Sequence, residues 1–218
     1  MSHHHGKGDW SDPDFVKRMA QTYNVRYDDS FWNAFSSLTT KEPRPIVADF
    51  GCGPGLLLVD IANRFNADVA IALDESEEML NLAEVKLKER TNLKSIDIHL
   101  VNFDTEEIRI APATIDFAFS GFMLHEVAGP SDFASKVFRL IKPTGVYMVY
   151  DFISGNEDVF VRSMVEHGMS EEKARKRYPH MCRHSADEIT QILETSGFSE
   201  TRAKLIDEIR AVVVGLKR

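Results

Sequence analysis

The sequence predicts an α/β protein built on a doubly wound, largely parallel sheet. Apolar segments at residues 46–50, 69–73 and 145–151 are nearly continuous, as expected for strands that helices cover on both faces. Longer helical patterns alternate with these segments, which indicates βαβ units. The chain has 218 residues, 43% of them hydrophobic, and this is enough for one domain with a good core.

The N-terminal part precedes this alternation. Residues 1–8 read as a tag-like tail that contains three histidines, and residues 9–218 are expected to form a single domain. Apolar and aromatic residues at helical spacings predict two short helices within residues 12–40, which we expect to act as a helical lid. Two prolines that flank Arg44 then end the helical pattern.

The alternating part predicts eight elements in order along the chain. We expect strands at 46–50, 69–73, 97–101, 115–120 and 145–151, and helices at 55–65, 75–90 and 131–141. Because a helix separates most of these strands, they are expected to run parallel.

The C-terminal part departs from this rhythm. Residues 156–184 are polar with a helical pattern, so we expect a helical insert after the fifth strand. The next helix begins at Ser185, whose spacing to Glu188 is that of a capping box. Residues 199–206 and 207–217 predict two strands with almost no link, which requires an antiparallel pair.

A glycine-rich turn, "GCGPG" at 51–55, follows the first strand. Ligands of open α/β sheets bind at the carboxyl ends of the strands, and glycine lets the backbone turn sharply there. A dinucleotide fingerprint would need a glycine in place of Leu56, and Pro54 has no N–H for a phosphate. The turn therefore predicts a ligand that approaches closely and need not carry phosphate.

Acidic residues downstream indicate a nucleoside. Asp74 ends the second strand, roughly 20 residues beyond the glycines, where an acid accepts both ribose hydroxyls. Asp104 is expected to accept from a base amine, with Met79 and Phe103 on the two sides of a purine. The structural alternatives are a turn without ligand, a helix N-terminal acid at Asp74, a cap at Asp104 and a core position for Met79.

Five segments in this order resemble the motifs of the class I S-adenosylmethionine-dependent methyltransferases. They are "VADFGCGPG", "ALDESEEML", "VNFDTEEI", "IDFAFSGFMLHEV" and "RLIKPTGVYMVYDF", and the likeness runs from about Ile46 to Asp151. The resemblance implies S-adenosyl-L-methionine as cofactor and a Rossmann-like sheet of seven strands in the order 3-2-1-4-5-7-6, the last one antiparallel. Thr144 departs from the glycine that is common in the last motif.

The resemblance also implies the cofactor contacts. It places the methionine part of the cofactor beside Asp49, Gly51, Gly53 and Gly55. Asp74 would hold the ribose, and Asp104 would face the adenine. We further expect cofactor contacts from Tyr23, Cys52, Glu75, Met79, Phe103 and Ser120.

The acceptor side is expected after the fourth strand, at the edge nearest the transferred methyl group in this architecture. His125 is a candidate general base, since its ordinary pKa suits neutral pH, and Glu126 is expected to orient it or bind a cationic substrate. The alternative is that His125 only caps or packs at a helix start. Tyr23, Tyr27 and Trp32 are expected to form a lid over the cofactor that excludes water, and Tyr27 and Trp32 to contact the substrate. The alternative is an apolar helix face on the sheet.

The segment "YPHMCRH" contains His180, Cys182 and His184 at alternate positions. Zinc takes four protein ligands, or three and a water, so we expect no metal. Tyr178, His180 and Arg183 are instead expected to contribute to the acceptor pocket.

Composition narrows the class of partner. The chain carries 26 basic and 34 acidic side chains, a formal net charge of −8, whereas nucleic-acid-binding domains are usually basic. Two cysteines suit a reducing cytoplasm, and no apolar run approaches a membrane span. We expect a cytoplasmic monomer or homodimer that methylates a small molecule. The alternatives are an RNA- or protein-directed methyltransferase and a non-catalytic S-adenosylmethionine-binding module.

Overall fold

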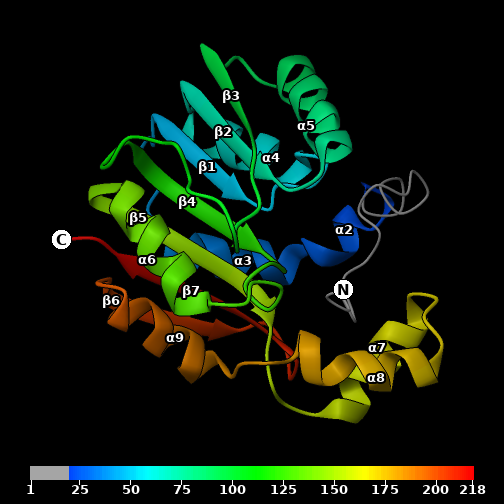
Figure 1. Ribbon diagram of the computed structural model, residues 1–218. Coiled ribbons are helices and arrows are strands. Elements are labelled where there is room, and N and C mark those ends of the chain that lie inside the picture. Colours follow the sequence, from blue (N-terminus) through cyan, green and yellow to red (C-terminus); the bar gives the residue numbers. More distant parts are fainter. Residues whose placement is uncertain (1–19) are drawn as a thin grey trace.

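The computed structural model describes residues 20–218, which form a seven-stranded sheet with helices on both faces (Figure 1). The strands are β1 (Ile46–Phe50), β2 (Val69–Asp74), β3 (Ser95–Leu100), β4 (Ile115–Gly121), β5 (Ile141–Phe152), β6 (Ser199–Leu205) and β7 (Arg210–Leu216). Their order is β3-β2-β1-β4-β5-β7-β6. Neighbours from β3 to β5 pair in parallel, and β7 is antiparallel to both β5 and β6. This topology confirms the predicted fold class.

The helices are α2 (Tyr23–Arg26), α3 (Asp29–Leu38), α4 (Leu56–Phe65), α5 (Glu77–Arg90), α6 (Pro130–Leu140), α7 (Glu157–Glu166), α8 (Glu171–Met181) and α9 (Ala186–Thr195). The capping box predicted at Ser185 is present: its side chain accepts from the Glu188 backbone N–H, and the Glu188 side chain accepts from the Ser185 backbone N–H. Among the described residues, no helix has both the length and the apolar character that crossing a membrane requires.

Two apolar layers pack on opposite faces of the sheet. On one face Phe31 of α3, Leu58 of α4 and Leu80 of α5 belong to one buried cluster. On the other face Phe133 of α6 and Ile189 of α9 belong to a second buried cluster. Strands that are buried on both sides explain why their sequences are continuously apolar. The predicted doubly wound arrangement follows from these two layers.

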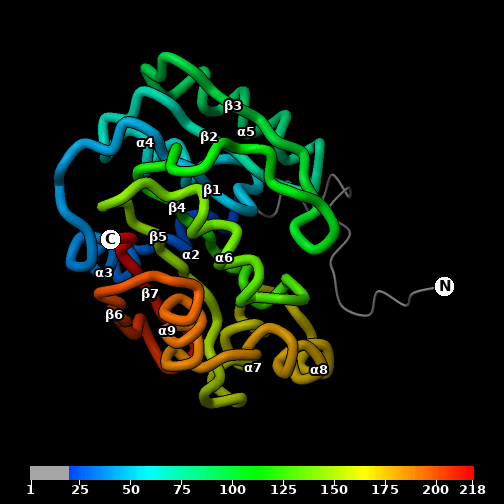
Figure 2. Tube along the Cα trace, turned by 60° about the vertical axis from the view of Figure 1, so that its left-hand side comes forward, coloured from blue at the N-terminus to red at the C-terminus, as the bar shows by residue number. Residues whose placement is uncertain are grey.

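The helical insert after β5 is a pair of helices rather than one continuous helix. Gly168, with a φ of +88°, lies between α7 and α8, where the chain reverses. Figures 1 and 2 both show α7 and α8 side by side, set apart from the helices that cover the sheet. The pair has its own small buried cluster, made of Phe160, Val161, Ala174, Met181, Cys182 and Ile209. The insert is therefore a satellite layer at one end of the sheet.

The third and fifth strands both start earlier than predicted. The third strand starts at Ser95, two residues early, because Ser95 pairs with Val69 at the start of β2. The fifth strand starts at Ile141, directly after α6, and pairs with Ile115 before a register shift. In both cases the neighbouring strand determines the boundary, and the local sequence pattern does not report it.

Gly55 allows close helix packing. It precedes α4 with a φ of +75°, and a Cβ at this position would lie 2.7 Å from the Cα atom of Ala83 in α5. The residue therefore lets α4 and α5 approach each other, and its expected contact with a cofactor stays a prediction.

We predict that Gly55→Ala destabilises the protein more than Gly53→Ala. Both positions have positive φ values, but a Cβ at Gly53 meets nothing within 4 Å. The left-handed backbone costs about 1–2 kcal/mol in each variant. Overpacking against Ala83 adds about 1–3 kcal/mol at Gly55 alone. Urea unfolding of both variants measures the difference, and equal losses of unfolding free energy would contradict the packing role.

Candidate functional site

Two cavities flank the glycine turn at the carboxyl ends of the strands. The first is lined by Gly51, Gly53, Asp74, Glu75, Met79, Phe103, Asp104, Phe122, Met123, Glu126 and Val127. The second is lined by Tyr23, Arg26, Tyr27, Asp49, Gly51, Cys52, Gly53, Pro54, Leu56 and Leu57. Because Gly51 and Gly53 border both cavities, a single elongated ligand can extend across the turn from one to the other.

The end of β2 holds the turn in place. The backbone N–H groups of Gly51 and Cys52 both donate to the carbonyl oxygen of Leu73, at 2.8 and 3.0 Å. Gly51 has a φ of +82°, and a Cβ there would lie 2.8 Å from Cγ of Met123. A side chain at position 51 would therefore collide with the loop after β4.

Asp74 connects this turn to α5. Its Oδ2 accepts from the Gly53 N–H at 2.8 Å, and its Oδ1 accepts from the Ser76 N–H at 3.0 Å. Burial raises the pKa of Asp74, and the two backbone hydrogen bonds partly oppose that rise. Each carboxylate oxygen has a second lone pair, so Asp74 can still accept from hydroxyl groups in the first cavity. The ribose role and the helix-start role predicted as alternatives are compatible.

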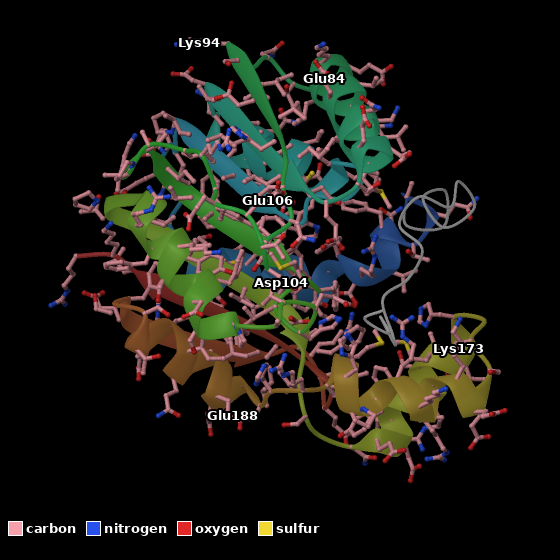
Figure 3. The ribbon with its side chains drawn as sticks, in the orientation of Figure 1. Glu84, Lys94, Asp104, Glu106, Lys173 and Glu188 are labelled. Carbon is pink, nitrogen blue, oxygen red and sulfur yellow. The ribbon has the colours of Figure 1, made fainter. Side chains whose placement is uncertain are left out.

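The three residues predicted to lie around an adenine, Met79, Phe103 and Asp104, line the first cavity and also make structural contacts. Met79 is almost completely buried yet borders the first cavity, and Phe103 stacks edge-on against Phe133. Asp104 Oδ1 accepts from the Ala128 N–H at 2.8 Å and so ties the loop after β3 to the loop after β4. Figure 3 shows Asp104 near the centre of the view, in the stretch between these two strands. Asp104 therefore borders the first cavity and at the same time accepts a backbone hydrogen bond, so the two predicted roles are compatible.

The second cavity contains a buried carboxylate with an unsatisfied oxygen. Asp49 is 2% exposed, and its Oδ1 has no hydrogen-bond partner. Burial raises the pKa of Asp49 well above its ordinary value, and the charge of Asp74 adds to the rise. A buried acid without a partner is costly unless a donor arrives, and an ammonium group is the donor that best suits a carboxylate.

Arg26 borders the same cavity, and the sequence reasoning missed it. A guanidinium beside this cavity suits the carboxylate of an amino-acid-like ligand. The signal in the sequence was its position three residues after Tyr23, which places both on one face of a helix. Tyr23 itself donates a short hydrogen bond to Asp60, and Tyr27 is buried against Phe31. The segment before β1 thus contributes one cation, Arg26, and two tyrosines, Tyr23 and Tyr27, to the second cavity.

A chain of four ionisable side chains adjoins the first cavity. The ring nitrogen Nδ1 of His125 lies 2.6 Å from Oδ1 of Asp151, and its Nε2 lies 3.3 Å from Oε1 of Glu126. Oε2 of Glu126 lies 3.1 Å from Nε2 of His180 in α8. The Asp151 carboxylate also accepts from the His125 and Phe152 backbone N–H groups. Asp151, which sequence reasoning missed, ends the predicted strand at 145–151, beside the strand that leads to His125.

The pKa values of His125 and Glu126 follow from the contacts among these side chains. Burial by itself lowers the pKa of His125, but the charge of Asp151 and the hydrogen bonds to Asp151 and Glu126 outweigh it and raise the pKa to about 9. Burial raises the pKa of Glu126, but His125 and then His180 lower it to about 2. At neutral pH, His125 is therefore an imidazolium with both ring nitrogens engaged. This geometry does not support the predicted general-base role of His125.

Ser120 and Trp32 are among the predicted site residues that line neither cavity. Ser120 is fully buried, and its Oγ is 2.7 Å from the hydroxyl of Tyr147. Trp32 packs on the aromatic face of α3, and the guanidinium of Arg64 lies 3.8 Å from its ring centroid. The expected contacts of Ser120 with the cofactor and of Trp32 with the substrate stay predictions.

Tyr178 and Arg183 hold the insert in position. The Tyr178 hydroxyl donates to the Gly155 carbonyl at 2.7 Å and accepts from the Gly155 N–H. Arg183 donates from Nη1 to the carbonyl of Val127 at 3.1 Å, which joins the end of the insert to the loop after β4. Neither side chain borders the first or the second cavity, and their expected contact with an acceptor stays a prediction.

Comparisons with known proteins agree with this site. Residues 48–149, from β1 to β5, match the methyltransferase domain family. A malonyl-(acyl-carrier protein) O-methyltransferase of Marinomonas sp. (strain MWYL1) is 31% identical over 109 residues, which cover 50% of this chain and 38% of that protein. A demethylmenaquinone methyltransferase of Leptospira interrogans is 29% identical over 105 residues, which cover 48% and 42%. The matches span less than half of the length of either relative.

Among solved structures, the chain resembles a SAM-dependent methyltransferase from Aquifex aeolicus. The TM-score is 0.71 at 22% sequence identity, and the superposition covers 95% of this chain and 99% of the other. At this identity the likeness shows the shared fold, which is the seven-stranded arrangement described above.

We predict a pH-dependent contribution of His125 to stability. Because folding raises its pKa from 6.5 to about 9, the stabilisation is fully present below pH 6.5 and is lost as the pH rises through 9. The charged or titratable groups around it are Asp151, Glu126, His180 and His184. Urea unfolding of the wild type and His125→Gln from pH 6 to 10 should give a difference that shrinks by on the order of 3 kcal/mol. A difference that stays constant or grows with pH would contradict a buried imidazolium.

Proposed function

Because this chain belongs to the class I S-adenosylmethionine-dependent methyltransferases, we propose that it transfers the methyl group of S-adenosylmethionine to a small-molecule acceptor. The observation that carries the proposal is the pair of cavities on either side of the glycine turn. One contains the unpartnered oxygen of Asp49 beside Arg26, and the other contains Asp74. An amino acid joined to a nucleoside needs this combination of groups.

The residues of the second cavity match the amino-acid end of the cofactor. Asp49 supplies the acceptor for an ammonium group, and Arg26 supplies the donors for a carboxylate. Tyr23 and Tyr27 come from the lid and restrict access of water to this end. Gly51 and Gly53 keep the turn free of side chains where the two ends of the cofactor join.

The residues of the first cavity match the nucleoside end. Asp74 and Glu75 are placed for the ribose hydroxyls, since both border the cavity at the end of β2. Met79 and Phe103 provide apolar surface for the adenine ring, and Asp104 provides an acceptor for its amine. When bound, S-adenosylmethionine supplies a methyl group activated by the sulfonium charge. The chain then needs mainly to align an acceptor with that group.

A small-molecule acceptor fits the remaining wall of the first cavity. Phe122, Met123, Glu126 and Val127 all come from the loop after β4 and line the part of the first cavity that the nucleoside residues leave. The two curated relatives carry the names of malonyl-(acyl-carrier protein) and demethylmenaquinone methyltransferases. The net charge of −8 does not favour a nucleic-acid acceptor.

Calorimetry and a product assay test this proposal together. We expect titration with S-adenosylhomocysteine to show one site, and incubation of S-adenosylmethionine with a metabolite extract to release S-adenosylhomocysteine. Binding without release in small-molecule, RNA and protein fractions would identify a non-catalytic binding module. Release with only RNA or protein fractions would replace the small-molecule acceptor. Absence of binding would refute the cofactor assignment.

We predict that Asp49→Asn weakens cofactor binding while stabilising the unliganded protein. The amide keeps the shape of the side chain but removes a buried charge that lacks a partner at Oδ1. The affinity for S-adenosylmethionine should fall by about 10- to 100-fold, as a charged hydrogen bond is lost. The unfolding free energy without ligand should rise by about 1–3 kcal/mol. Calorimetry and urea unfolding measure the two effects. An unchanged affinity would show that no ammonium group binds at Asp49.

A further inference from the structure

We infer that Glu126 is the carboxylate that recognises the methyl acceptor, and that this acceptor is the neutral nitrogen of an amine carried on an apolar body. The inference rests on the proposed methyl transfer and names the substrate class of the same site. It is carried by the position of Glu126 in the first cavity and by the two histidines that hold its two oxygens.

The strand order separates Glu126 from the other acids of the cavity. Asp74 and Glu75 follow β2, and Asp104 follows β3, so all three lie on one side of β1. Glu126 follows β4, on the other side of β1. The nucleoside residues therefore occupy one flank of the glycine turn, and Glu126 occupies the flank that is left for an acceptor.

The carboxylate of Glu126 is fixed and permanently charged. Its side chain is 12% exposed, and His125 and His180 contact one oxygen each. The same contacts lower its pKa to about 2. A base of such low pKa is poorly matched to removing a proton at neutral pH. Glu126 is therefore suited to binding a donor or stabilising a positive charge, and not to general-base catalysis.

Glu126 places a negative charge beside the acceptor flank of the cavity. Asp151 and Glu126 share the buried imidazolium of His125, which is 4% exposed, and His180 contacts the second oxygen of Glu126. An acceptor that becomes positive during the reaction is stabilised by the carboxylate of Glu126. An anionic acceptor, such as a carboxylate or a thiolate, is repelled by Glu126 at short range.

Methylation of an amine produces this charge. The nitrogen lone pair forms a bond to the methyl carbon, the carbon–sulfur electron pair returns to sulfur, and the positive charge passes from sulfur to nitrogen. An amine that arrives as an ammonium first gives one proton to solvent, and a second N–H proton leaves to solvent after transfer, so the bond-forming step itself needs no base. A hydroxyl acceptor has to lose its proton in that step, yet among the described residues the only acid on the acceptor flank of the first cavity is Glu126, whose low pKa makes it a poor base.

Aromatic side chains next to Glu126 indicate an apolar body for the amine. Phe122 borders the cavity, and its ring packs 4.6 Å from Tyr150 and 4.8 Å from Phe152. Phe122 has a φ of +53°, a conformation that is unfavourable for a bulky residue and occurs preferentially at functional sites. An aromatic face next to a carboxylate provides both cation–π and apolar contact for an arylalkylamine.

The insert keeps Glu126 in position from the other side. His180 lies in α8 directly after Pro179, and Arg183 ties the end of the insert to the Val127 carbonyl. His125 and His180 are therefore positioning residues: they act on the acceptor through Glu126.

The first experiment identifies the atom that is methylated. The full-length chain is incubated with trideuteromethyl-labelled S-adenosylmethionine and a metabolite extract, and labelled products are identified by mass spectrometry. N-methyl products from amines are expected. Labelled products that are O-, S- or C-methyl, or no labelled product from a protein that binds S-adenosylhomocysteine, would overturn the amine assignment. Loss of cofactor binding itself would instead refute the proposed function.

The second experiment tests Glu126 with matched probes: phenethylamine, 2-phenylethanol and phenylacetate. We expect turnover of the amine alone. Glu126→Gln should lower kcat/KM for the amine by about 30- to 1,000-fold, because it removes the charge that stabilises the developing cation. The affinity for S-adenosylhomocysteine should change less than about twofold, which also shows that the variant is folded. Glu172→Gln, on the exposed first turn of α8, is the control with unchanged kinetics.

The positioning role of His180 has a separate readout. His180→Gln keeps a donor toward Glu126 and should retain most of the activity, whereas His180→Leu should raise KM for the amine more than it lowers kcat. Equal turnover of amine and alcohol, or unchanged kinetics in Glu126→Gln, would overturn the inference.

Discussion

The backbone of the turn at 51–55 is attached to the end of β2 by three hydrogen bonds, and both cavities depend on this attachment. Two N–H groups of the turn converge on the Leu73 carbonyl, and Gly53 donates to Asp74. The turn can adopt this conformation because its glycines accept positive φ values, and Gly51 leaves room for Met123 of the loop after β4. If the turn moved away from β2, Asp74 would lose its backbone donor and the wall shared by the two cavities would disappear. The conformation of the turn and the shape of both cavities therefore depend on the same hydrogen bonds to the end of β2.

Buried charge is arranged differently on the two sides of that turn. Asp49 is left with an unsatisfied oxygen, which disfavours the unliganded state and favours binding of a positively charged group. Glu126 is satisfied twice, by His125 and His180, so its charge is present before any ligand arrives. On the proposed function, the unsatisfied oxygen of Asp49 contributes to cofactor affinity. The fixed charge of Glu126 then provides a preorganised field, which is the arrangement that assists a change of charge in a transition state.

The sequence was sufficient for the features that rest on local pattern. Alternating apolar and helical segments predicted most of the sheet, and the spacing from the glycine turn to Asp74 predicted that the two meet at one cavity, because these signals lie within about one βαβ unit. It was insufficient where distant residues decide. Gly55 belongs to the motif by spacing, yet its close approach to Ala83 in another helix does not follow from that spacing. Asp151 could not be assigned from the spacing alone, because its partner His125 is 26 residues away and meets it only across the β4–β5 pair.

The glycine turn and Glu126 also differ in which parts of the chain hold them in place. The glycine turn is held by hydrogen bonds within the β1–β2 unit, such as the one between Gly53 and Asp74, 21 positions apart. The acceptor half depends on a contact between Glu126 and His180, 54 positions apart, one of which lies in the insert. The insert has its own small core, and its described link to the acceptor loop runs through His180 and Arg183. A change in the insert can therefore reorient Glu126 without disturbing the glycine turn, so acceptor choice can vary while the cofactor site stays the same.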